Sequence, residues 1–297
     1  MRLANNMKYK VTHTTKYDYD APVPVCHNVV YLTPRTTNVQ SCSRHRLTVN
    51  PTPTTHSKRI DYFGNAVSSF SIATSHRLLQ ITASSSVTIQ PRQLPSEGST
   101  LAWESIRNSL ATERSAEGLA TYQFAFPSPH VPFHPELSDY ARESFKPGLP
   151  ILEAIRSLNE RLHADVKYDP KATTISTPII EVFEHRRGVC QDQAHLMLGC
   201  LRALGLAARY VSGYVRTQPA GESPRLVGGD ASHAWVSVYC GSAGWIDVDP
   251  TNDSFPQTEH ITVAWGRDFS DVCPVAGMFI GGGNHQLDVS VDVMAIE

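Results

Sequence analysis

The hydrophobic periodicity of the chain changes partway along it, and this change limits the folds that it can adopt. Residues 8–91 alternate apolar and polar side chains, as in 46–49 and 69–72, which is typical of half-buried strands. Gly64-Asn65 separates two such runs and predicts a hairpin turn. We therefore expect an antiparallel, sandwich-like β domain over 8–91, followed by a linker rich in Pro, Gly and Ser over 91–100.

The second part of the chain contains helical patterns. Residues 150–162 repeat their apolar positions with helical spacing, and residues 190–204 are apolar nearly all round, as expected for a helix buried in a core. Five further segments resemble strands between Gly and Pro clusters: 207–215, 234–240, 245–248, 261–265 and 287–296. These patterns predict an α+β domain over 101–297, in which a central helix packs on an antiparallel sheet.

Charge and composition limit the partners that we expect. The 297 residues carry a formal net charge of -2, so the net charge of the chain does not favour binding to nucleic acid or to an anionic membrane. The sequence contains neither a secretory leader nor an apolar run long enough to span a bilayer, and we expect a cytoplasmic protein. The histidines and cysteines lack the spacing of metal ligands, so we expect neither a metal nor a cofactor.

Cys190 has the position expected of a nucleophile. It lies at the predicted start of the buried helix, directly after the segment 187–189. The unpaired N–H groups of a helix N-terminus favour a thiolate and can also hold a developing oxyanion. Gly188 would let the backbone turn tightly before the nucleophile. We predict that Cys190 is catalytic, with Gln191 and Asp192 as neighbouring oxyanion or supporting residues.

A thiol nucleophile also needs a base and a group that orients the base. His233 opens the strand-like segment 233–239 and is the best-placed histidine for the first role. The segment 244–252 would form a neighbouring strand and offers Asp249 at its end. Asp247 is two residues away and points to the same face, so proximity does not separate the two carboxylates.

These segments resemble the bacterial transglutaminase-like family. The resemblance rests on Gly-Val-Cys-Gln-Asp (188–192), Ser-His-Ala-Trp (232–235) and Gly-Trp-Ile-Asp-Val-Asp-Pro-Thr-Asn (244–252), and it extends to 201–214 and 266–272. The β-rich first ninety residues look like the separate N-terminal domain of the family. The resemblance implies a papain-like core, maps its triad onto Cys190, His233 and Asp249, and favours Asp249 over Asp247.

The expected activity is acyl transfer through a thioester on Cys190. We expect a peptidase or amidase that acts on a peptide or protein substrate. A protein-glutamine transglutaminase with an amine acceptor is the alternative, because the triad does not distinguish water from an amine. A binding or scaffold module without activity is the alternative from another class. The oligomeric state does not follow from the sequence.

Several other residues have simpler explanations. Asp192 could cap the helix, or pair with Arg267 or Arg209. His195 lies about 140° around the helix from Cys190 and should point away from it. The segment Gly281-Gly282-Gly283 predicts a turn, and packing roles are expected for the remaining candidates, which are Cys26, Cys42, Cys200, Cys240, Cys273, Trp235 and Trp245.

Overall fold

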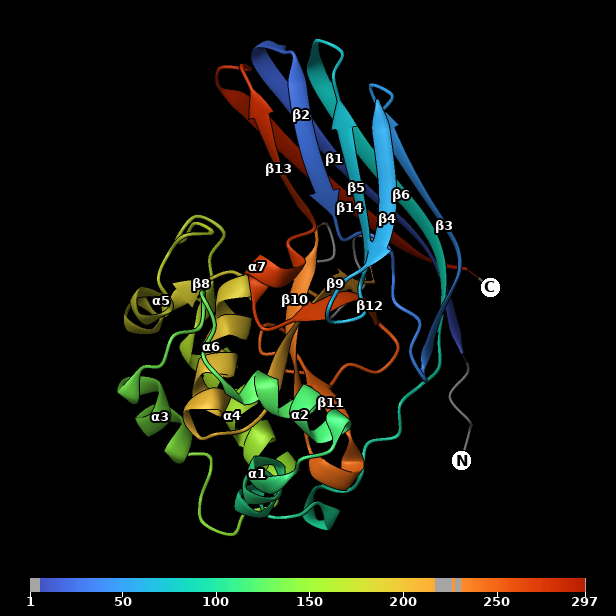
Figure 1. The fold of residues 1–297 in the computed structure, drawn as a ribbon. Coiled ribbons are helices and arrows are strands. Elements are labelled where there is room, and N and C mark those ends of the chain that lie inside the picture. The colour runs from blue at the N-terminus through green and yellow to red at the C-terminus, as the bar shows by residue number, and fades with distance from the viewer. Residues whose placement is uncertain (1–5, 217–225, 228–230, 297) are drawn as a thin grey trace.

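The computed structural model describes residues 6–216, 226–227 and 231–296. A β-sandwich lies above a mixed core of helices and strands, and the two chain ends lie on the same side of the molecule (Figure 1). This is the α+β architecture that the sequence predicts. None of the helices in the described ranges is both long and apolar enough to cross a bilayer.

The sandwich consists of two four-stranded sheets, with strand orders β14-β1-β6-β3 and β13-β2-β5-β4. Apolar side chains of both sheets, such as Tyr19, Phe70 and Ile81, form one buried cluster. This confirms the predicted β domain. The strands are β1 (Met7–Val23), β2 (Val25–Val30), β3 (Gln40–Asn50), β4 (Thr55–Ile60), β5 (Ala66–Ile72), β6 (His76–Ile89), β13 (Val275–Ile280) and β14 (His285–Ile296).

The last two strands correct the expected extent of the second domain, which included 275–296. β14 pairs with β1 from Lys8↔Ile296 to Tyr19↔His285, and β13 pairs with β2. The core is therefore inserted between strands of the sandwich. Without β13 and β14, both β1 and β2 would have an unpaired edge, which is costly for a long strand. The predicted turn at 281–283 joins the two strands, and all three glycines have positive φ.

The predicted hairpin is present between β4 and β5, with a longer connection than the two-residue turn expected. Asp61 N donates to Asn65 O, and Gly64 has a φ of 77°, a value that favours glycine. The Asn65 side chain donates to Trp265 O at 2.9 Å and accepts from Trp265 N at 3.0 Å. This loop thus joins the sandwich to the core.

The core sheet has the order β11-β10-β9-β12. Helix α6 (Cys190–Ala203) contacts β9 and β10, and its apolar side chains are buried, as predicted. The strands are β9 (Ala208–Val215), β10 (His233–Tyr239), β11 (Trp245–Val248) and β12 (His260–Gly266), and a short pair joins β7 (Lys167–Tyr168) to β8 (Arg187–Gly188). The other helices are α1 (Trp103–Thr112), α2 (Ala116–Tyr122), α3 (Pro135–Arg142), α4 (Ile151–Asp165), α5 (Ile179–His185) and α7 (Phe269–Val272).

Candidate active site

Cys190 is the first residue of α6, and Asp192 fixes this end of the helix. The buried Asp192 carboxylate accepts from Val189 N at 2.8 Å and from Thr173 Oγ1 at 2.6 Å. A Cβ atom at Gly188 would lie 2.6 Å from Asp192 Oδ2. Glycine is therefore required here because the carboxylate approaches the backbone closely. Of the roles considered for Asp192, the structure supports the helix cap.

The Cys190 side chain is half-buried and borders a cavity of about 210 Å³. Gln191 also borders this cavity, whereas Asp192 does not. The N–H groups of the first helical turn have no acceptor within the helix. The other described residues around the cavity are Tyr168, Val189, Tyr210, Ser212, Ser232, His233, Ala234, Phe269 and Pro274.

His233 borders the same cavity as Cys190 and is hydrogen-bonded to Asp249. Its Nε2 donates to Asp249 Oδ2 at 2.8 Å, and both side chains are fully buried. Since Nε2 is bound to the carboxylate, Nδ1 is the ring nitrogen available to the thiol, and it has no hydrogen-bond partner in the described part of the chain. Burial lowers the pKa of His233, but the Asp249 charge and the nearby Cys190 outweigh burial and raise the pKa to about 10.

The Asp249 carboxylate accepts five hydrogen bonds from the described residues. Oδ2 accepts from His233, from Asn252 Nδ2 at 2.7 Å and from His260 Nε2 at 2.9 Å. Oδ1 accepts from the backbone N–H groups of Thr251 and Asn252. Burial opposes ionisation of Asp249, but these donors and the adjacent imidazoles hold its pKa well below the usual range. The carboxylate is thus ionised and fixed in direction.

The roles of His260 and Asn252 were not predicted from the sequence. Asn252 belongs to the predicted segment 244–252, and His260 directly precedes the predicted strand 261–265, which was the available signal. β9 lies between β10 and β12, with His233 opposite Gly213 and His260 opposite Val215. A Cβ atom at Gly213 would lie 2.2 Å from Ile261 O, so glycine permits this close approach.

The other candidates lie elsewhere. Asp247 borders a second cavity and pairs with Arg92 at 3.6 Å, whereas the carboxylate bound to His233 among the described residues is that of Asp249. His195 is buried and accepts from Phe269 N at 3.2 Å, and burial lowers its pKa to about 3.

Trp235 is fully buried, as expected, whereas Trp245 borders the second cavity. Cys26, Cys200 and Cys240 are buried, and Cys42 and Cys273 are half-buried.

The ligand-type atoms of His233, Asp249 and His260 lie within 4.8 Å of one another. Two imidazoles and a carboxylate could bind zinc in another arrangement. Here the Asn252 amide nitrogen lies 2.7 Å from Asp249 Oδ2 and 3.4 Å from His233 Nε2. A hydrogen-bond donor therefore occupies the space between these two ligands, and the arrangement fits a hydrogen-bonded network better than a metal centre.

Comparisons with known proteins show the family of the chain. Residues 9–88 match the bacterial transglutaminase-like N-terminal region, and residues 138–250 match the transglutaminase-like superfamily. An uncharacterized protein of Mycobacterium tuberculosis (strain ATCC 25618 / H37Rv) is 40% identical over 99% of this chain and 95% of its own length. The chain belongs to the bacterial transglutaminase-like family.

Two further similarities are more limited. A proposed cysteine protease from Cytophaga hutchinsonii superposes with a TM-score of 0.79 at 20% identity, over 99% of this chain and 92% of that chain, which shows a common fold. A protein-glutamine gamma-glutamyltransferase of Pseudomonas aeruginosa is 35% identical over 30% of this chain and 15% of its own length. Members of the transglutaminase-like superfamily are generally cysteine-dependent enzymes.

Proposed function

We propose that this family member is a cysteine-dependent hydrolase that cleaves amide bonds of peptides or proteins through an acyl-thioester on Cys190. The observation that carries the proposal is the orientation of His233. Its Nε2 is fixed by Asp249, which leaves Nδ1 for the thiol at the start of α6. This is the order of nucleophile, base and orienting carboxylate that thiol-dependent acyl transfer requires.

The expected reaction has two steps. The Cys190 thiolate attacks the substrate carbonyl carbon, an S–C bond forms, and the oxygen gains a negative charge. Helix-terminal N–H groups near Cys190 and Gln191 would stabilise this oxyanion. As the C–N bond breaks, the His233 Nδ1 proton moves to the departing nitrogen. Water then donates a proton to Nδ1 while its oxygen attacks the thioester, and the acid and the Cys190 thiolate are released.

The described residues around the cavity favour water over an amine as the second reactant. An amine acceptor such as a lysine side chain carries a positive charge, and a carboxylate would help to bind it. Among the described residues that line the cavity beside Cys190, none is Asp or Glu. The similarity to the Pseudomonas aeruginosa gamma-glutamyltransferase supports transamidation as the second candidate.

A glutamine-containing peptide library, supplied with and without a labelled primary amine, separates these activities. Hydrolysis is expected to release ammonia or an amine without incorporation of the label, and Cys190→Ala should reduce turnover by about 10³-fold or more. Incorporation of the amine as the main outcome would support the transglutaminase instead.

Alkylation tests the alternative of a module without activity. Iodoacetamide should label Cys190 faster than the half-buried Cys42 near neutral pH, with both sites quantified by mass spectrometry. Cys190→Ala identifies the fast site, and His233→Gln should slow its labelling. Equal rates at Cys190 and Cys42 would support the scaffold module.

A further inference from the structure

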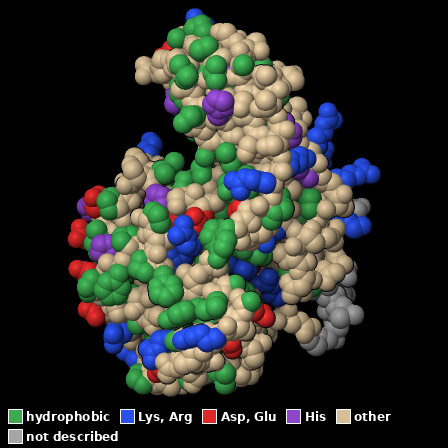
Figure 2. Space-filling model, viewed as in Figure 1, with side chains coloured by type: hydrophobic (Ala, Val, Ile, Leu, Met, Phe, Trp, Pro, Cys, Tyr) green, Lys and Arg blue, Asp and Glu red, His purple; other side chains and the backbone are tan. Residues whose placement is uncertain are grey.

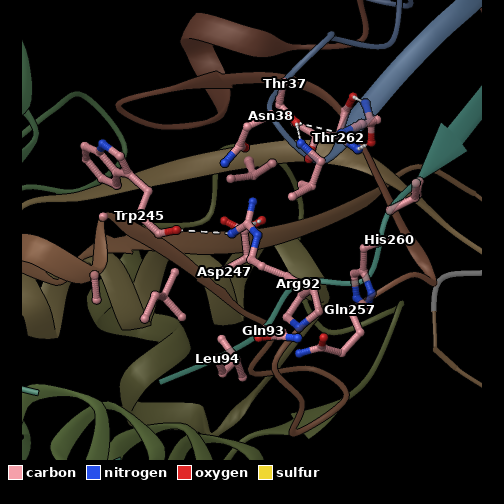
Figure 3. A pocket seen from close by; sticks show the side chains of 18 of the residues that line it. Thr37, Asn38, Arg92, Gln93, Leu94, Trp245, Asp247, Gln257, His260 and Thr262 are labelled. Carbon is pink, nitrogen blue, oxygen red and sulfur yellow. Dashed lines mark hydrogen bonds and ion pairs between the residues drawn. The ribbon is translucent and has the colours of Figure 1, made fainter. Parts of the chain in front are cut away.

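A second cavity of about 340 Å³ lies between the sandwich, the linker and the core sheet. Asn38 comes from the chain before β3, Arg92 and Gln93 come from the linker, and Trp245 and Gln257 come from the core (Figure 3). It shares no lining residue with the cavity beside Cys190 among the residues described. Lys and Arg side chains gather around the junction of the two parts (Figure 2).

Arg209 lines this cavity and stacks against two indole rings. Its guanidinium carbon lies 3.7 Å from the centroid of the Trp265 ring and 4.3 Å from that of Trp245. Arg35 lies 3.4 Å from the same Trp265 centroid, so the two guanidinium groups must occupy opposite faces of that ring. Stacking of this kind holds the guanidinium plane and leaves its N–H edge available to a planar anionic group.

The described residues that line the cavity do not fully balance its positive charge. Arg92 and Arg209 are the two lining arginines, and Asp247 is the single lining carboxylate among the described residues. Asp247 pairs with Arg92 at 3.6 Å, whereas Arg209 Nε has no hydrogen-bond partner in the same part of the chain. Burial lowers the pKa of Arg209 to about 9, with Asp247 opposing the shift and Arg35 and Arg92 adding to it. A buried cation of this kind is stabilised by an anionic partner.

The remaining walls suit a small organic molecule. The side-chain amides of Asn38, Gln93 and Gln257 provide both donors and acceptors, and the two indole rings provide apolar surface. The volume is near the lower end of that of small-molecule sites. We propose that this cavity binds a small organic anion whose carboxylate or phosphate group is held by Arg92 and Arg209.

His260 connects this cavity to the candidate active site. It borders the cavity, and its Nε2 donates to Asp249 Oδ2 at 2.9 Å. An anion bound beside His260 would therefore alter the position of a donor to Asp249. This coupling rests on the proposed function, whereas binding of the anion does not.

Binding is tested on the full chain by isothermal titration calorimetry. The probes are inorganic phosphate and glutarate, each titrated at constant ionic strength against chloride. Saturable binding of one probe is expected, and the probe that saturates distinguishes a phosphate from a carboxylate ligand. Arg209→Lys, which loses the planar fork, and Arg92→Gln should each weaken binding about tenfold or more. Binding of neither probe above the chloride control would overturn the proposal.

Matched controls separate binding from folding and from catalysis. The exposed Arg77, which donates to Asp20 O in the sandwich, supplies the control Arg77→Gln, and this variant should bind normally. Equal affinity of the wild type, Arg209→Lys and Arg92→Gln would also overturn the proposal. Since Arg92 is partly exposed, Arg92→Gln remains informative if Arg209→Lys fails to fold. Titration of Cys190→Ala should give the wild-type affinity whether or not the chain is a hydrolase.

Discussion

His260 Nε2 lies 2.9 Å from Asp249 Oδ2, the oxygen that also accepts from His233 Nε2 at 2.8 Å. The two rings come from β12 and β10, which are separated by β9 in the core sheet. A carboxylate only accepts hydrogen bonds, so both imidazoles carry their proton on Nε2 in this arrangement. His260 is therefore a positioning residue that supports the carboxylate behind His233.

Replacement of His260 should lower activity without removing the nucleophile or the base. His260→Phe removes a hydrogen bond to a charged group, and we expect kcat/KM to fall about tenfold to a hundredfold. His260→Gln keeps a donor and should recover much of this loss. The pH profile of kcat/KM should shift for His260→Phe and not for His260→Gln. Equal activity of the two variants, with equal Tm values, would contradict the positioning role.

Asp249 and Asp247 should differ greatly in their effect on catalysis. Asp249→Asn removes the negative charge and replaces one acceptor oxygen with an NH2 donor, so the His233 tautomer is no longer fixed, and we expect kcat to fall by about 10³-fold or more. Asp247→Asn weakens a partly buried pair with Arg92 outside the cavity beside Cys190 and should leave kcat within a few fold. Asp247→Asn serves as the control for Asp249→Asn in the same assay, because both substitutions replace a carboxylate with an amide of the same size. A larger effect at Asp247 would reverse the assignment.

The raised pKa of His233 predicts how stability depends on pH. A pKa raised from 6.5 to about 10 stabilises the folded state fully below about pH 6.5, and the contribution is lost as pH rises toward 10. The difference in free energy of unfolding between the wild type and His233→Gln should therefore shrink over this range in urea titrations. In an Asp249→Asn background the pH dependence should be much weaker. A difference that grows with pH would contradict the ion pair.

Neighbouring residues of β14 should differ in their tolerance of charge. Val293 is fully buried, whereas 47% of Met294 is exposed on the opposite face of the strand. Val293→Asp buries an unpaired carboxylate and should lower the free energy of unfolding by about 3 kcal/mol or more. Met294→Asp should change it by less than about 1 kcal/mol. Similar losses in thermal and urea unfolding would argue against the packing of the C-terminal strand on the sandwich.

The local part of the candidate site could be predicted from the sequence. The apolar pattern after Gly188 predicts a buried helix that begins at Cys190, and the structure has α6 at that position. His233 opens β10, and Asp249 directly follows β11, as their segments indicate. These features depend on periodicity and on the groups at helix and strand ends, which are properties of short stretches of chain.

The tertiary structure decided which distant segments meet. A strand pattern at 287–296 does not reveal its partner, and only the unpaired edge of β1 places it in the sandwich. His260 reaches Asp249 because β12, which carries His260, and β10, which carries His233, both pair with β9. Arg209 contacts Trp265 and Trp245 because the strands that carry these three residues belong to one sheet. The sequence by itself determined the helix that carries Cys190, since local hydrophobic order suffices for it. Pairing between distant strands placed His260 beside Asp249 and formed the arginine-lined cavity. Local patterns do not predict such pairing, because it depends on contacts between residues far apart in the chain.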